Sequence, residues 1–331
     1  MSSTLIRAKT MPSGPSPFVT PGPKLQPQKF VDPRITAKGE TRARVPLHAL
    51  NTLWFNTGSL CNLACANCFM ESSPTNDALL YLTYDEVRSY LDEVTTGDFA
   101  TGEIGFTGGE PFMNPDIIPM LTDALDRGFD VLVLTNGMRP MRKLEAALLE
   151  LRAAHGDRLT LRVSLDHYDK AVHEAERGER SFDPAMDGLV WLSRNGFRIA
   201  VAGRHLASES DADAREGYRR LFEDKGIAID TGNPGELVLF PEMDETIDVP
   251  EITTACWQIL GKSPKDVMCA TSRMVVKRKG EDEARVAACT LLPYDREFDM
   301  GGTLNEARRS VALNHPHCAK FCVLGGASCS A

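Results

Sequence analysis

The sequence predicts an α/β protein, a partial (β/α)6 barrel followed by a small C-terminal β-hairpin domain that binds metal. Three observations lead to this prediction. Short apolar runs alternate with amphipathic helical segments between residues 51 and 240, which is typical of parallel strands joined by crossover helices. About six such units fit in that span, too few for a complete eight-fold barrel. After residue 250 the alternation stops, and six of the nine cysteines lie there.

The elements are assigned from the period of their apolar residues and from their terminal residues. Strands are expected at 53–56, 103–107, 130–134, 159–165, 198–202 and either 227–230 or 237–240. The helix after the first strand begins with a capping box of Thr83 and Glu86. Asn114 is expected to cap the second helix. Further helices are expected at 141–154, 183–196 and 211–224.

The chain is expected to divide into three segments, residues 1–50, 51–248 and 249–331. Residues 1–50 hold eight of the twenty prolines, a composition that cannot bury a core and predicts an extended, mobile arm. Residues 51–248 form the barrel. Residues 249–331 contain two β-rich runs, 273–279 and 284–290, around a Gly-Glu-Asp-Glu turn, and a helix expected at 304–311. Because this hairpin offers little apolar surface, we expect a bound metal to fix it.

Composition excludes several classes of protein. The chain has 331 residues, 42% hydrophobic and 25% charged, as in ordinary globular proteins, and no apolar run approaches the ~18 residues of a membrane span. Of its net charge of −9, residues 1–50 carry +6 and the remainder −15. An acidic body does not neutralise phosphates, so nucleic acid is not an expected partner, nor is a membrane. Without a secretory signal the protein is expected in the cytoplasm, where clustered cysteines indicate metal or redox chemistry.

Three cysteines, Cys61, Cys65 and Cys68, lie within eight residues directly after the first expected strand. Three thiolates in one loop can converge on one inorganic cluster. A structural zinc ion takes four protein ligands, and no fourth cysteine lies nearby in the sequence. On a four-iron cluster, three cysteines leave one iron open to a substrate or cofactor. A zinc site or an electron-transfer site is the alternative interpretation.

The spacing C-x3-C-x2-C resembles that of the radical S-adenosylmethionine (SAM) family, and the resemblance extends over residues 51–240. Gly108, Gly109 and Glu110 end the second strand, where family members hold the amino group of SAM. The other matching positions also end strands; they are Asn136, Ser164 and Asp166. The family often has an aromatic residue before the third cysteine, whereas this chain has Asn67 there and Phe69 after the cysteine.

The resemblance implies a 4Fe-4S cluster on the three cysteines, with SAM bound to its open iron. It also implies an electron donor such as flavodoxin or ferredoxin, and reductive cleavage of SAM. The product is a 5′-deoxyadenosyl radical that abstracts hydrogen from a substrate carbon.

The C-terminal cysteines resemble the twitch or SPASM extension of the same family, which holds auxiliary 4Fe-4S clusters. The expected ligands of a second 4Fe-4S cluster are Cys269, Cys289, Cys318 and Cys322. Cys256 or Cys329 could replace one of them or stay free, and a zinc site with four cysteines is the alternative. His315 and His317 are expected on the surface, and Arg204, His205 and Glu242 are further candidates for substrate contact.

Three functions follow from these features. The first is a radical SAM oxidoreductase acting on a small metabolite, in the manner of the dehydrogenases with one auxiliary cluster. The second is a maturase of the SPASM type that modifies a peptide or a protein side chain. The third is a non-catalytic iron–sulfur electron carrier, which would not need the Gly-Gly-Glu segment. Formation of 5′-deoxyadenosine separates the third from the first two, and a peptide partner separates the second from the first.

Overall fold

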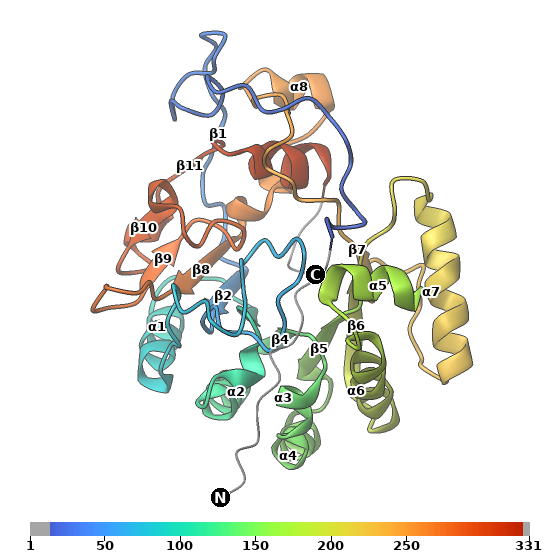
Figure 1. Cartoon of the computed structure of the whole chain (residues 1–331). Helices are drawn as coiled ribbons and strands as arrows, with labels where there is room; N and C mark the ends of the chain where they lie inside the picture. The colour runs from blue at the N-terminus through green and yellow to red at the C-terminus, as the bar shows by residue number, and fades with distance from the viewer. Residues whose placement is uncertain (1–13, 327–331) are drawn as a thin grey trace, which may run out of the picture.

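The computed structural model describes residues 14–326. Within these residues, nine strands form one sheet in the order β10-β9-β8-β2-β3-β4-β5-β6-β7 (Figure 1). Strands β2 to β7 lie in chain order and run parallel. Their bounds are β2 Thr52–Asn56, β3 Glu103–Thr107, β4 Asp130–Thr135, β5 Leu159–Ser164, β6 Arg198–Gly203 and β7 Leu237–Leu239. This is the expected partial (β/α)6 barrel.

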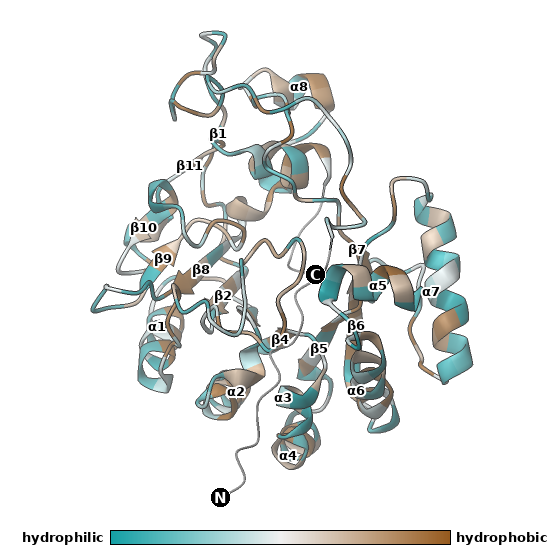
Figure 2. Cartoon of the chain, viewed as in Figure 1, coloured by the Kyte–Doolittle hydropathy of each residue, from teal (hydrophilic) through white to brown (hydrophobic). Residues whose placement is uncertain are grey.

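The helices pack outside the sheet and follow the strands in alternation (Figure 1). They are α1 Tyr84–Thr96, α2 Ile117–Asp126, α3 Arg139–Arg142, α4 Glu145–His155, α5 Lys170–Arg177, α6 Phe182–Arg194 and α7 Asp211–Lys225. The short helix α8, Cys256–Leu260, lies apart from them in the C-terminal part of the chain (Figure 1). Figure 2 shows brown and teal residues side by side on α4, α6 and α7, as expected for helices that bury one face. The capping box of Thr83 and Glu86 is present at α1.

Two details of the helical prediction are wrong. The second helix begins at Ile117. The side-chain amide of Asn114 donates to the carbonyl oxygens of Thr57 and Leu82, and its oxygen accepts from the Asp116 amide, which forms a turn before the helix. No long helix forms at 304–311. A short 3-10 turn, Glu306–Arg308, is followed by the strand β11, Val311–Ala312. Carbonyl oxygens of this segment accept hydrogen bonds from the Arg273 guanidinium, which replace bonds within a helix.

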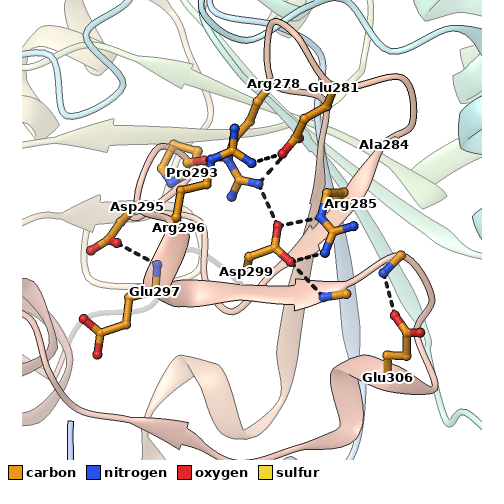
Figure 3. A network of polar contacts seen from close by, with 12 residues as sticks. Arg278, Glu281, Ala284, Arg285, Pro293, Asp295, Arg296, Glu297, Asp299 and Glu306 are labelled. Carbon is orange, nitrogen blue, oxygen red and sulfur yellow. Dashed lines mark hydrogen bonds and ion pairs between the residues drawn. The ribbon is translucent and has the colours of Figure 1, made fainter.

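The C-terminal hairpin continues the barrel sheet. Strand β8, Ser272–Val276, pairs parallel to β2, and β9, Arg285–Ala287, pairs antiparallel to β8. Strand β10, Asp299–Gly301, extends the sheet beyond β9. The hairpin is fixed by a network of ion pairs as well as by burial, with Asp299 at its centre between Arg278 and Arg285 at 2.9 and 2.7 Å (Figure 3).

The segment before the barrel differs from the expected mobile arm. Residues 14–43 have little regular structure, and β1, Arg44–Val45, pairs with β11. Arg42 is buried and its Nη2 bonds Glu251 Oε1 at 2.5 Å, while Lys29 pairs with Asp248 at 2.7 Å. The prolines prevent helix and interior strand, but these charged contacts fix the segment along residues 246–253.

Candidate functional site

The carboxyl ends of β2 to β7 surround a cavity of about 140 Å³ that is open in part to solvent. Eight residues that the sequence analysis singled out line it, namely Cys61, Cys65, Cys68, Gly108, Gly109, Asn136, Ser164 and Asp166. The opposite wall is apolar, with Phe240, Met243, Leu291 and Phe321. The structure therefore brings the expected cysteines and the expected strand-end residues together at one place.

The loop that carries Cys61, Cys65 and Cys68 is held from two sides. The Cys61 amide donates to the carbonyl oxygen of Ser73 at 3.0 Å. The amides of Ala66 and Asn67 donate to the carbonyl oxygen and the carboxylate of Glu176, at 2.7 and 3.0 Å. The loop is thus ordered by protein contacts on both flanks of Cys65.

The thiol geometry fits a cluster better than a single ion. Zn²⁺ at about 2.3 Å from each sulfur would bring its ligand sulfurs to within about 4 Å of one another. Among residues 14–326, no three cysteine sulfurs lie within 4.8 Å of one another, whereas a cluster spaces its ligands because each binds a different iron. Burial raises the pKa of Cys61 to about 12, so its thiolate requires a bound cation. These residues fit an iron–sulfur cluster.

The two glycines bring the end of β3 against the cysteine loop. A Cβ at Gly109 would lie 2.3 Å from the carbonyl oxygen of Leu60, and one at Gly108, whose φ is +140°, would lie 2.6 Å from that of Gly58. The amides of Gly109 and Glu110 donate to the same two carbonyl oxygens, at 2.8 and 3.2 Å. Both positions need glycine because the backbones touch.

Glu110 is the one expected barrel residue that is not among the lining residues of the cavity. Its carboxylate is buried and accepts bonds from the Thr135 hydroxyl and from the amides of Asn136 and Phe112, at 2.9, 2.8 and 3.1 Å. These hydrogen bonds favour the charged form, but burial outweighs them and raises the pKa of Glu110 to about 7. Asn136 in turn directs its amide group to Cys61 Sγ at 3.9 Å. Glu110 therefore orders the end of β4 beside the cysteine loop.

Arg177 is a functional candidate that the sequence analysis missed. It lies at the end of α5, which was not predicted, although Asp169 caps that helix through the amides of Ala171 and Val172. Arg177 lines the cavity and pairs with Asp166 at 2.6 Å. Burial alone would raise the pKa of Asp166, but the guanidinium groups of Arg177 and Arg204 lower it to about 2. Asp166 is therefore a carboxylate held between two cations.

Arg204 and Glu242 join the same buried network. Arg204 lies 3.5 Å from Asp166, 3.2 Å from Glu242 and 3.8 Å from Glu176. The side-chain amide of Asn67 donates to Glu242, and Phe69 lines the cavity. His205 lies at a neighbouring cavity. The network ties the cysteine loop to the ends of β5, β6 and β7.

The four expected C-terminal cysteines line a second, small cavity of about 20 Å³. Cys269, Cys289, Cys318 and Cys322 share it with apolar side chains, and Leu291 lines both cavities. Cys256 is not among its lining residues, and its sulfur accepts from the Thr253 amide at 3.3 Å. Cys329 lies outside the described residues. Among these four cysteines, too, no three sulfurs lie within 4.8 Å of one another.

The expectation of two surface histidines is wrong for His317, which is 6% exposed and lines the second cavity. His315 lies 3.3 Å from Glu245 through Nε2, and its Nδ1 accepts from the His317 amide at 3.1 Å. A neutral His315 therefore carries its proton on Nε2 and donates to Glu245. His315, His317 and Glu245 each offer a ligand atom, and these atoms lie within 4.8 Å of one another, the geometry of a candidate metal site.

The fold is an α/β partial barrel whose cavity is lined by three cysteines from the loop after its first barrel strand. The family model described as the Radical SAM superfamily matches residues 55–216. The chain belongs to the radical SAM superfamily. This membership favours the two radical SAM interpretations over the electron-carrier alternative.

Two curated relatives illustrate the similarity. The chain is 34% identical over 169 residues to the antilisterial bacteriocin subtilosin biosynthesis protein AlbA of Bacillus subtilis, covering 51% of this chain and 35% of that protein. It is 31% identical over 140 residues to the mycofactocin maturase MftC of Mycolicibacterium smegmatis, covering 42% of this chain and 33% of that protein. The matches thus span about a third of the length of these relatives.

A solved structure shares the fold. The structure of anSMEcpe with bound AdoMet has a TM-score of 0.55 at 14% identity, and the match covers 80% of this chain and 83% of that chain. Among residues 14–326, no helix combines the length and the apolar character that a bilayer crossing needs.

Proposed function

We propose that this chain is a radical SAM maturase that modifies a side chain of a peptide or protein. The names of the relatives, a bacteriocin biosynthesis protein and a mycofactocin maturase, support the peptide alternative more than the expected small metabolite. The observation that carries the proposal is the continuity of the space at the barrel mouth, where two cavities share the wall residue Phe240.

That space consists of two neighbouring cavities with a common wall. The cavity beside the cysteine loop meets the neighbouring cavity at Phe240, which lines both. The neighbouring cavity is lined by Phe18, Pro21 and Ile247 and by the ammonium group of Lys320. A peptide can place one residue beside the cysteine loop and the adjoining residues along the neighbouring cavity. A small metabolite would leave the neighbouring cavity empty.

Each cofactor has a proposed set of residues. Cys61, Cys65 and Cys68 hold the 4Fe-4S cluster that binds SAM, and Cys269, Cys289, Cys318 and Cys322 hold an auxiliary 4Fe-4S cluster of the twitch or SPASM kind. When bound, the first cluster and SAM supply the electron and the 5′-deoxyadenosyl radical that removes hydrogen from a substrate carbon. Flavodoxin or ferredoxin is the proposed electron donor.

In this scheme the residues of the chain bind SAM and orient it beside the substrate. Ser164 and the remaining N–H donors of Arg177 face the cavity, where they suit the ribose and the carboxylate of SAM. Gly108 and Gly109 present backbone groups, and Glu110 keeps Asn136 in place. Phe240, Met243 and Phe321 exclude water from the site of hydrogen abstraction.

A mass-spectrometric assay tests the proposal. The reconstituted full chain is incubated anaerobically with SAM, dithionite and synthetic copies of the short peptides encoded beside its gene. We expect a mass change in one peptide that requires SAM and that a Cys61→Ala variant does not produce. The proposal is refuted if no peptide changes while a small polyol is oxidised in proportion to 5′-deoxyadenosine, because that result identifies a small-metabolite dehydrogenase.

A further inference from the structure

Arg273, at the start of β8, is a buried arginine with no carboxylate within 4.0 Å among residues 14–326. Its exposed fraction is 1%. Nη1 donates to the carbonyl oxygens of Cys269 and Ser272 at 2.6 and 2.7 Å. Nε and Nη2 donate to those of Ala307 and Arg309, at 2.9 and 3.2 Å. All of these acceptors are backbone carbonyl groups, which carry no net charge.

Three other arginines with little exposed surface are paired with carboxylates. Arg42 pairs with Glu251, Arg177 with Asp166, and Arg278 with Asp299, at 2.5, 2.6 and 2.9 Å. Figure 3 shows the last of these pairs within its network. A buried charge is tolerated when an opposite charge lies nearby. No carboxylate of residues 14–326 lies within 4.0 Å of the Arg273 guanidinium.

The cysteines of the second cavity can supply the missing negative charge. Arg273 donates to the backbone carbonyl oxygen of Cys269 at 2.6 Å, so its guanidinium lies beside one of the expected ligands. Four thiolates around a dipositive metal core keep a net negative charge.

We propose that Arg273 is the fixed counter-charge of the metal site formed by Cys269, Cys289, Cys318 and Cys322. Its guanidinium stabilises the protein when that site holds metal and destabilises it when the site is empty. The same charge favours the reduced form of the auxiliary cluster. The inference rests on the proposed auxiliary site and is independent of the peptide substrate.

The two forms of the protein respond in opposite directions to loss of the charge. Arg273→Met keeps the length of the side chain without the guanidinium. Thermal unfolding is measured anaerobically on the full chain, once reconstituted and once after chelation of its metals. We expect Arg273→Met to lower Tm of the loaded form relative to wild type and to leave Tm of the metal-free form unchanged or raised. Arg278→Met, which breaks a carboxylate pair, is the control and lowers both.

A role of Arg273 as a clamp on four carbonyl groups would give a different result. In that case Arg273→Met lowers Tm of both forms equally, and the proposal is overturned. Iron, sulfide and zinc analysis of the same samples tests the auxiliary site separately, since a loaded site with equal Tm losses refutes only the counter-charge.

A second measurement tests the proposal if Arg273→Met folds poorly. In the chain with Cys61, Cys65 and Cys68 replaced by alanine, the midpoint potential of the remaining cluster is measured by EPR-monitored titration. Arg273→Lys, which keeps the charge, should stay near the parent value, and Arg273→Met should shift it to a lower potential. Equal potentials in all three proteins would overturn the proposal.

Discussion

Each buried charged side chain at the barrel mouth has its partner in a different element. Asp166 follows β5, Arg177 ends α5, Arg204 follows β6 and Glu242 follows β7. Cys61, Cys65, Cys68 and the strand-end residues could be predicted because they form local motifs. Arg177 and Arg273 could not, because their significance depends on partners that only the folded chain brings together.

Glu110 provides the prediction at this scale. Its two oxygens accept from three donors, and glutamine would replace one oxygen with an amide that faces a donor. We expect Glu110→Gln to keep its iron content but to bind SAM roughly ten- to a hundredfold more weakly, because a hydrogen bond to a charged group contributes about 1.5–3 kcal/mol. SAM affinity and iron are measured in parallel.

The control is Glu103→Gln, at the opposite end of β3, where the carboxylate accepts from the Thr52 hydroxyl at 3.1 Å. This change should leave SAM affinity unaltered. Loss of iron with normal SAM affinity in Glu110→Gln would contradict the role of Glu110 in ordering Asn136.

The elements follow the sequence where local signals are strong. The capping box fixed the start of α1, and alternation predicted the parallel strands. Tertiary contacts decided the exceptions, since segment 304–311 bonds Arg273 instead of forming a helix. Of the two candidates for the last barrel strand, 237–239 forms it, because it pairs with β6. The hairpin was expected to depend on metal, whereas its ion pairs provide a second source of stability.

Asp299 tests that second source. Burial would raise the pKa of Asp299, but Arg285, the Gly301 amide and Arg278 lower it from 3.8 to about 2. Its stabilisation is therefore complete above about pH 4 and is lost as pH falls toward 2. We expect Asp299→Asn to lower the free energy of unfolding at pH 7 by about 1–3 kcal/mol, measured by urea unfolding, and the difference from wild type to shrink on acidification.

Glu216→Gln is the matched control, since Glu216 pairs with Arg219 and Arg220 on the exposed side of α7. Exposed pairs contribute about 0–1 kcal/mol. A loss in Asp299→Asn no larger than in this control would show that the network in Figure 3 adds nothing to the hairpin.

At the scale of the whole molecule, the sheet places two cysteine sites on either side of Leu291, which lines both cavities. The resemblance to the family predicts each set of ligands. The sequence could not predict their closeness, because that follows from the parallel pairing of β8 with β2. This pairing continues the barrel sheet into the C-terminal hairpin and brings Cys269 and Cys289 to the barrel.

The independence of the two sites is the last prediction. Their cysteines come from separate segments, and the loop of Cys61, Cys65 and Cys68 is held by Glu176 and Ser73 rather than by the C-terminal cysteines. Replacing all three by alanine should therefore abolish 5′-deoxyadenosine formation and leave about four iron and four sulfide per chain in the second site. Anaerobic reconstitution with metal and sulfide analysis measures this, and Cys256→Ala, outside both cavities, is the control that should keep both clusters. Stoichiometric zinc without sulfide in the triple variant would identify the second site as a structural zinc site and leave the barrel site unaffected.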